Sequence, residues 1–303
     1  MPVEKDVRSL ITGSLRGEAL FGEPLGRHTS LKVGGPADIF AVPADLDDLR
    51  RLLGVICEAE VPHLVIGGGY NLLVRDGGFR GVVISLRNLH KLEMLPGNRL
   101  RAESGATNGA LVRFAEERRL AGLEFLIGIP GTAGGALSVN AGAHGEAILD
   151  PLETLTTLRD GHIRTTARGE LNYGYRCLDL APGEIIIAGT FALRPGDPAE
   201  IETRIEGFLA HRRTAQRVNH PNAGSFFMNP AGMHAWRLID DAGLRGYRIG
   251  GAEVSEVHAN FFVNRGGATA RDFLELAALV KERVKARCGV DLEEEVRIVG
   301  EEG

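Results

Sequence analysis

Short apolar runs and one amphipathic stretch alternate in the first part of the chain. Residues Asp38–Pro43, 63–66 and 82–86 are mainly apolar, and polar or glycine residues flank them, which predicts three strands. Between the first two runs, apolar residues recur at helical spacing over 46–56, directly after Asp45, a suitable N-cap. The order strand, helix, strand, loop, strand predicts an α/β unit with a glycine loop at the carboxyl end of a strand, where ligands tend to bind.

The middle of the chain carries mixed helix and strand patterns. Apolar spacing predicts a short helix over 110–115, a strand over 184–193 and a helix from 198 to about 213. Asp160-Gly161 is typical of a tight turn between two strands. These patterns predict an α+β region.

The last part begins with a recognisable helix start. Thr269 and Asp272 have the spacing of a capping box, an apolar face continues to Val284, and Gly289 is placed to end the helix. A final strand is expected over 295–300.

Composition and charge exclude several classes of protein. Hydrophobic residues make up 44% and charged residues 25%, which is ordinary for a globular chain, and the net charge of −5 argues against a nucleic-acid binder. The three cysteines form no CxxC pair, so no metal site is expected. Residues 1–20 lack the apolar core of a signal peptide, and no run of roughly 20 apolar residues occurs. A cytoplasmic protein without membrane insertion is therefore expected.

Glycine is the compositional exception, with 41 of 303 residues against an average of about 7%. The loop Gly67–Asn71 follows a predicted strand, but it lacks both the sixth glycine of a Rossmann fingerprint and the Lys-Ser/Thr of a Walker loop. Its spacing fits an anion cradle or a plain turn, and both readings stay open. The longer tract Gly128–Gly142 is rich in small residues and suits either a large flat ligand or a buried crossover.

These segments together resemble one enzyme family. Arg27–Asp38, Gly67–Val74, Gly128–Gly135 and Asn140–Ala143 are similar, in order and content, to UDP-N-acetylenolpyruvoylglucosamine reductases over about residues 20–300. The resemblance implies an α+β (α/β) protein with a two-part FAD-binding region of the vanillyl-alcohol-oxidase/PCMH type and a C-terminal α+β substrate domain.

The implied domains are an FAD-binding subdomain over 1–87, a second over 88–195 and a substrate-binding domain over 196–303. The C-terminal strand, about 291–303, is expected to return to the first subdomain. The resemblance also implies that FAD is bound noncovalently by Gly67, Gly68, Gly69, Tyr70, Asn71, Gly131, Thr132 and Gly135. The family usually has serine at position 70, so we expect the backbone N–H of Tyr70 to make that contact.

The family reaction reduces an enolpyruvyl ether on a UDP-sugar, with NADPH as reductant. By resemblance, Arg176 binds the substrate carboxylate, Glu295 is its acidic partner, and Ser225 donates the proton. Among Glu293, Glu294 and Glu295, only the family register selects the last.

The remaining expectations concern substrate contacts and assembly. Tyr175, Asn229 and Asn260 are candidates for binding the sugar nucleotide. Met228 stands where the family often has a basic residue, and positive charge is expected instead from Arg212, Arg213 and Arg217, for which a solvated helix face is the alternative. The short interval between Arg176 and Ser225 indicates the shorter, second type of the family, and a monomer is expected.

Two other functions compete with this one. A flavin oxidase of the same fold is one, with covalent attachment through His144 as a variant. A nucleotide-binding protein that has lost its activity is the other, although such a protein need not retain Arg176, Ser225 and Glu295.

Overall fold

The computed structural model describes residue 3, residues 5–215 and residues 218–303. The chain forms two compact units, each drawn from three separate stretches. The first comprises Met1–Phe21, Ile39–Gly68 and Gly81–Arg212, and the second comprises Gly22–Asp38, Gly69–Arg80 and Arg213–Gly303. The predicted division at 87/88 and 195/196 concerns functional regions and stays a prediction.

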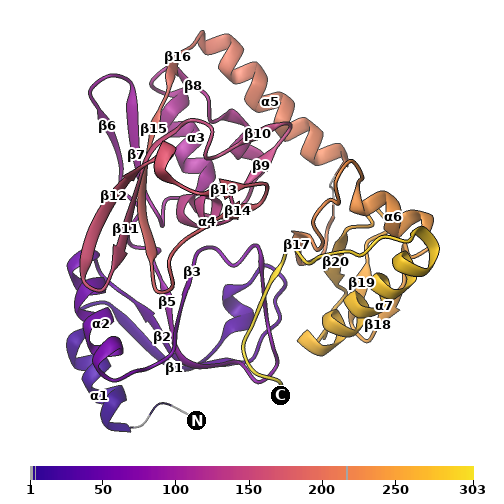
Figure 1. Cartoon of the computed structure of the whole chain (residues 1–303), viewed down its shortest axis with the longest axis horizontal. Helices are drawn as coiled ribbons and strands as arrows, with labels where there is room; N and C mark the ends of the chain where they lie inside the picture. The colour runs from indigo at the N-terminus through magenta and orange to yellow at the C-terminus, as the bar shows by residue number, and fades with distance from the viewer. Residues whose placement is uncertain (1–2, 4, 216–217) are drawn as a thin grey trace. The chain divides into compact units, whose positions relative to one another are not determined.

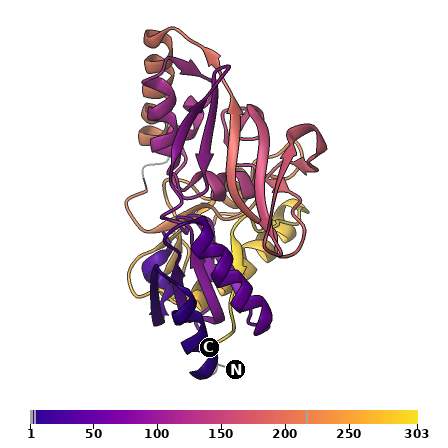
Figure 2. The ribbon, with the colours of Figure 1, turned by 90° about the vertical axis from the view of Figure 1, so that its left-hand side faces the viewer.

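A four-stranded sheet, in the order β1-β2-β5-β3, forms one half of the first unit. Its strands and helices are β1 (Glu18–Pro24), β2 (Pro36–Val42), β3 (His63–Ile66), β5 (Phe79–Ser85), α1 (Lys5–Ser14) and α2 (Leu46–Glu58). Figure 2 shows the two helices beside this sheet. Asp45 accepts a hydrogen bond from the Asp48 N–H and caps α2, as predicted. The apolar faces pack around Ile39, Leu49 and Ile84.

A five-stranded antiparallel sheet, β12-β11-β15-β7-β6, forms the other half of the first unit (Figure 1). Its strands are β6 (Leu92–Leu95), β7 (Arg99–Glu103), β11 (Leu152–Arg159), β12 (His162–Ala167) and β15 (Ile185–Ala192). The predicted turn joins β11 to β12. Asp160 and Gly161 have φ values of 49° and 75°, as a type I′ hairpin requires.

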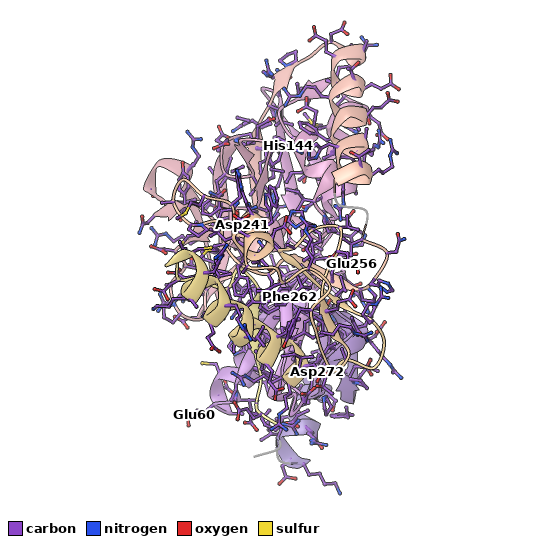
Figure 3. The ribbon with its side chains drawn as sticks, turned by 90° about the vertical axis from the view of Figure 1, so that its right-hand side faces the viewer. Glu60, His144, Asp241, Glu256, Phe262 and Asp272 are labelled. Carbon is purple, nitrogen blue, oxygen red and sulfur yellow. The ribbon has the colours of Figure 1, made fainter. Side chains whose placement is uncertain are left out.

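Short elements and three helices complete the first unit. They are α3 (Asn108–Glu116), α4 (Ala133–Ser138), α5 (Pro198–Ala215), β8 (Leu120–Ala121), β9 (Gly142–Ala143), β10 (Glu146–Ala147), β13 (Tyr173–Gly174), β14 (Cys177–Leu178), β16 (Arg194–Pro195) and the 3₁₀ turns η2 (Glu124–Gly128) and η3 (Arg168–Glu170). The helices α3 and α5 lie where the apolar spacing predicted them. His144, labelled in Figure 3, lies beside α5, with its ring centroid 4.8 Å from that of Phe208.

The second unit packs helices on a small antiparallel sheet, β17-β20-β19-β18. Its elements are η1 (Leu25–His28), β4 (Leu72–Val74), β17 (Asn222–Ser225), β18 (Arg248–Ile249), β19 (Ala252–Val254), β20 (Phe261–Asn264), β21 (Arg297–Val299), α6 (Ala235–Asp241) and α7 (Ala270–Cys288). The capping box of Thr269 and Asp272 is present, and Gly289 ends α7 with φ 72°. Phe262 lies in the core of this unit, and Asp272 at the start of α7 (Figure 3).

The last strand pairs far back along the chain. β21 runs parallel to β4, with Arg297 opposite Leu72 and Val299 opposite Val74. It is shorter than the predicted 295–300 because Glu295 and Val296 donate instead to the carbonyl of Phe226.

Candidate active site

The glycine loop Gly67–Asn71 leaves β3 and enters β4, which confirms the strand–loop–strand order and excludes a Rossmann helix at this point. Within the described residues, none of the five backbone N–H groups of the loop donates to a protein acceptor. Gly69 has φ +67°, and a Cβ there would lie 2.0 Å from the carbonyl oxygen of His28. The loop therefore offers a run of unused donors on a backbone that only glycine allows at that position, as an anionic diphosphate requires.

The second glycine tract lies against the start of this loop within the first unit. A Cβ on Gly67 would lie 2.6 Å from Oγ1 of Thr132 and 3.7 Å from Cα of Gly135. The Thr132 hydroxyl caps α4 by accepting from the Gly135 N–H, and the carbonyl of Gly131 accepts from the Asn108 N–H at 3.0 Å. The start of the first glycine loop, at Gly67, thus lies against the second glycine tract.

Arg176 sits at the tip of a tight hairpin in the first unit. Tyr175 and Arg176 form the turn between β13 and β14, and Arg176 has φ 54°. The Arg176 guanidinium lies 5.5 Å from the ring centroid of exposed Tyr175. Buried Asn140, from the glycine tract, donates to the Gly174 carbonyl at 2.8 Å and anchors the hairpin.

Ser225 ends β17 in the second unit, where it pairs with Phe261. Ser225 therefore lies at the end of a strand and does not cap a helix. Asn260 holds the segment that follows this strand, because its Oδ1 accepts from the Phe227 N–H at 3.0 Å and its Nδ2 donates to the Phe227 carbonyl at 2.8 Å. Its side chain is only 2% exposed. Asn260 therefore supports the Ser225 strand through both of its amide groups.

Glu295 lies beside this strand in the second unit. Its N–H donates to the Phe226 carbonyl at 2.8 Å, and its carbonyl accepts from Nδ2 of Asn71 at 3.0 Å. The neighbouring Glu294 forms an ion pair in which both carboxylate oxygens lie 3.1 Å from Nζ of Lys281. Glu293, the first residue of the run, is exposed to solvent.

The other predicted residues occupy varied positions. Asn229 accepts from the Ala235 N–H at 3.0 Å and so supports the first turn of α6. Tyr70 is 45% exposed and stays available to a ligand. Arg212 and Arg213 belong to α5, whereas Arg217 lies outside the described residues.

Sequence reasoning missed an aromatic group beside the Ser225 strand. The ring centroid of His258 lies 4.5 Å from that of Phe261 and 6.4 Å from that of Trp236. Burial, together with the positive charge of Arg245, lowers the pKa of His258 below its usual value. Aromatic residues that come together from separate elements leave no local sequence signal.

Comparison with known proteins identifies the family. A model described as the C-terminal domain of UDP-N-acetylenolpyruvoylglucosamine reductase matches residues 216–299, and a model of an FAD binding domain matches residues 37–166. A protein named UDP-N-acetylenolpyruvoylglucosamine reductase from Geotalea uraniireducens is 64% identical over 97% of this chain and 98% of its own length. The chain belongs to the UDP-N-acetylenolpyruvoylglucosamine reductase family.

Further relatives in this reductase family support the assignment. The protein of the same name from Geobacter metallireducens is 61% identical over 96% of this chain and 97% of its own length. The crystal structure of the reductase from Thermus caldophilus superimposes with a TM-score of 0.80 at 35% identity, covering 94% of this chain and 99% of that one. The predicted fold class, a mixed α and β protein with an FAD-binding region of the vanillyl-alcohol-oxidase type, is confirmed.

The described residues contain no group of three or more His, Cys, Asp or Glu side chains arranged to hold a metal ion. None of their helices combines the length and the apolar character that crossing a membrane would need.

Proposed function

We propose that the chain is an FAD-dependent reductase that uses NADPH to convert the enolpyruvyl ether of UDP-N-acetylglucosamine to UDP-N-acetylmuramate, in peptidoglycan precursor synthesis. This is UDP-N-acetylmuramate dehydrogenase activity. The observation that carries the proposal is the double attachment of Glu295, whose backbone is bonded both to Phe226, next to Ser225, and to Asn71 of the glycine loop. The acid, the serine and the predicted cofactor loop thus belong to one hydrogen-bonded assembly.

The glycine loops suit a noncovalent FAD. Five unused N–H groups over Gly67–Asn71 can bind the diphosphate, while the surface near Gly131, Thr132 and Gly135 can approach the flavin without side chains in the way. When bound, FAD supplies the hydride that NADPH provides. His144 packs against Phe208 and His211 on the side of α5, which gives no reason to invoke a covalent link through it.

Arg176 is proposed to bind the carboxylate of the enolpyruvyl group. A guanidinium can bind both carboxylate oxygens with two parallel N–H donors, which fixes the plane of the substrate. The bound charge also stabilises the negative charge that develops on this carboxylate when hydride adds to the enol carbon. The Asn140 anchor limits the freedom of the hairpin that carries Arg176.

Ser225 is proposed to complete the reaction by proton transfer. Hydride adds to one carbon of the double bond, the electron pair moves to the adjacent carbon and its carboxylate, and the Ser225 hydroxyl then gives its proton to that adjacent carbon. Solvent returns a proton to the serine oxygen. An alcohol serves despite its high pKa because the acceptor is a strong base and its position is fixed. Glu295, in its protonated form, donates a hydrogen bond to the same carboxylate oxygens.

Anaerobic stopped-flow spectroscopy tests the proposal. NADPH is expected to bleach the flavin, and UDP-N-acetylglucosamine enolpyruvate is expected to restore its absorbance without oxygen. In Ser225→Ala the first step should keep its rate, while the second should slow by about 10²–10⁴-fold. Ser9→Ala, on the exposed face of α1, is the matched control and should change neither step. Equal loss of both steps in Ser225→Ala would contradict the proton-donor role.

The substrates in this proposal are small molecules, namely the UDP-sugar enolpyruvyl ether and NADPH, with Tyr175 and Asn229 as candidate contacts. We further propose a cytoplasmic, monomeric enzyme, with the mass measured by light scattering at working concentration as the check on assembly. A mass of twice 32.5 kDa would replace the monomer by a dimer.

A further inference from the structure

Asn71 joins β4 to β21 in an unusual way. In a regular parallel pair, one residue donates its own N–H to the residue before its partner and accepts, through its own carbonyl, from the residue after it. Asn71 keeps the second bond, because its carbonyl accepts from the Arg297 N–H at 3.1 Å. The first bond is made by its side chain, since Nδ2 rather than the backbone N–H donates to the Glu295 carbonyl at 3.0 Å.

This arrangement leaves the backbone N–H of Asn71 without a partner in the strand pair. The side-chain amide of Asn71 takes the place of a peptide N–H in the ladder, and the peptide N–H itself donates to no protein acceptor among the described residues. It therefore joins the unused donors of Gly67–Tyr70. Five adjacent backbone N–H groups can together bind a diphosphate, and the N–H of Asn71 can take part because the side chain of Asn71 makes the strand hydrogen bond in its place.

The same arrangement fixes the backbone of Glu295. Its N–H is held by the Phe226 carbonyl at 2.8 Å and its carbonyl by Asn71, so both backbone groups of this residue are fixed, from opposite partners. These two backbone hydrogen bonds fix the position from which the Glu295 side chain leaves the chain.

We propose that Asn71 is a positioning residue with two linked tasks: its side chain fixes the backbone of Glu295, and this frees its own N–H for the cofactor diphosphate. The inference rests on the proposed function for the role of Glu295. Asparagine suits both tasks because its amide copies a peptide group. Aspartate has no donor at that position, and alanine leaves the Glu295 carbonyl to the backbone N–H of residue 71.

The first test uses Asn71→Ala without substrate. The freed Glu295 carbonyl should recruit the backbone N–H of residue 71, so one amide in the peptide 67–74 of the flavin-free protein should exchange with deuterium at least tenfold more slowly. FAD binding, followed by flavin fluorescence, should weaken by about tenfold, the effect of losing one hydrogen bond to a charged group. Asn88→Ala is the matched control, since Asn88 also donates one 3.0 Å bond to a backbone carbonyl, that of Pro43, and should change neither result. Unchanged exchange and unchanged FAD affinity in Asn71→Ala would overturn the proposal.

The second test asks whether Asn71 acts through Glu295. At saturating FAD the backbone N–H of residue 71 is bound to the diphosphate, so in Asn71→Ala the Glu295 carbonyl has no donor. Reoxidation by the enolpyruvyl substrate should then slow by about tenfold, and by more than flavin reduction by NADPH. In the Glu295→Gln background the same substitution should slow reoxidation less than about twofold, because residues that act as a unit are not additive. Full additivity would refute a role through Glu295.

The two tests distinguish a failure of this inference from a failure of the proposed function. If the parental protein fails to reduce the enolpyruvyl ether, the proposed function falls. The exchange and FAD-affinity results on Asn71→Ala still decide whether its side chain replaces its backbone N–H.

Discussion

Asn260 supports the Ser225 strand with both groups of its amide, and truncating it has a cost that can be worked out. Asn260→Ala leaves the N–H and the carbonyl of Phe227 without partners in a region where Phe227 is 0% exposed. Each buried backbone group left unsatisfied costs about 1–3 kcal/mol. We therefore expect the second unit to lose about 4 kcal/mol of stability, a large share of the 5–15 kcal/mol typical of a whole domain.

The single tryptophan allows the stability of the second unit to be measured. Trp236 lies in α6 of the second unit, so its fluorescence during urea unfolding reports on that unit. With a slope of about 2 kcal/mol per molar urea, a loss of about 4 kcal/mol lowers the midpoint by about 2 M.

Asn222→Ala is the matched control for this measurement. Asn222 also makes two hydrogen bonds with backbone groups, those of His220 and Gly224, but it is half-buried, so water can replace them. Its midpoint should fall by about 0.5 M or less. If Asn260→Ala shifted the midpoint no more than this control, the assumption that Phe227 depends on Asn260 would be wrong.

Two further predictions concern the glycine loop and the capping box. Gly67→Ala would place a methyl carbon 2.6 Å from Oγ1 of Thr132, so the purified variant should lose most of its bound flavin by absorbance. The control Gly54→Ala, in the open middle of α2, should keep flavin and gain about 0.5–1 kcal/mol in thermal unfolding. Burial alone would raise the pKa of Asp272, but hydrogen bonds from Thr269 and Gly251 outweigh burial and lower the pKa below its usual value. A carboxyl group whose pKa is lower in the folded state stabilises the fold at pH values above its pKa in the unfolded chain. This stabilisation is lost as the pH falls through its pKa in the folded state. The decrease in urea midpoint caused by Asp272→Asn should therefore be full near neutral pH and shrink below about pH 4. A penalty that does not depend on pH would contradict this.

The elements that could be predicted from the sequence carry their signals locally. Helix α2 has its cap and its apolar face within the same stretch, and α7 has both its capping box and its terminal glycine. The Asp160-Gly161 hairpin depends only on two residues that tolerate positive φ. In each case the residues that decide the structure are neighbours in the chain.

The sheet of the second unit could not be predicted because its strands are two to four residues long and because β17 pairs with a strand far along the chain, with Asn222 opposite Val263. Alternation is not detectable over such lengths. The second compact unit draws on distant stretches, since residues 22–38 and 69–80 pack with 213–303, and no local pattern marks such packing.

At the site, the resemblance supplied what local physics could not. No charge pattern separates Glu295 from Glu293 and Glu294, and only the family register selects it; the structure adds that Lys281 forms an ion pair with Glu294. The side chains that support the site also could not be identified from the sequence. The amides of Asn71, Asn140 and Asn260 were expected to contact ligands or were given no role, whereas the structure has each donating to a backbone carbonyl.

The pairing of β21 with β4 has a consequence for how the protein is made. The second unit needs Leu72–Val74, which the ribosome produces early, and Arg297–Val299, which it produces last. At about 5–20 residues per second, the early strand waits on the order of tens of seconds for its partner, while most of the first unit is already complete. During this interval β4 is an unpaired apolar strand and open to wrong pairing. A nascent chain arrested shortly before its end should therefore hold a folded first unit and an unfolded second one, and would be a natural client for chaperones.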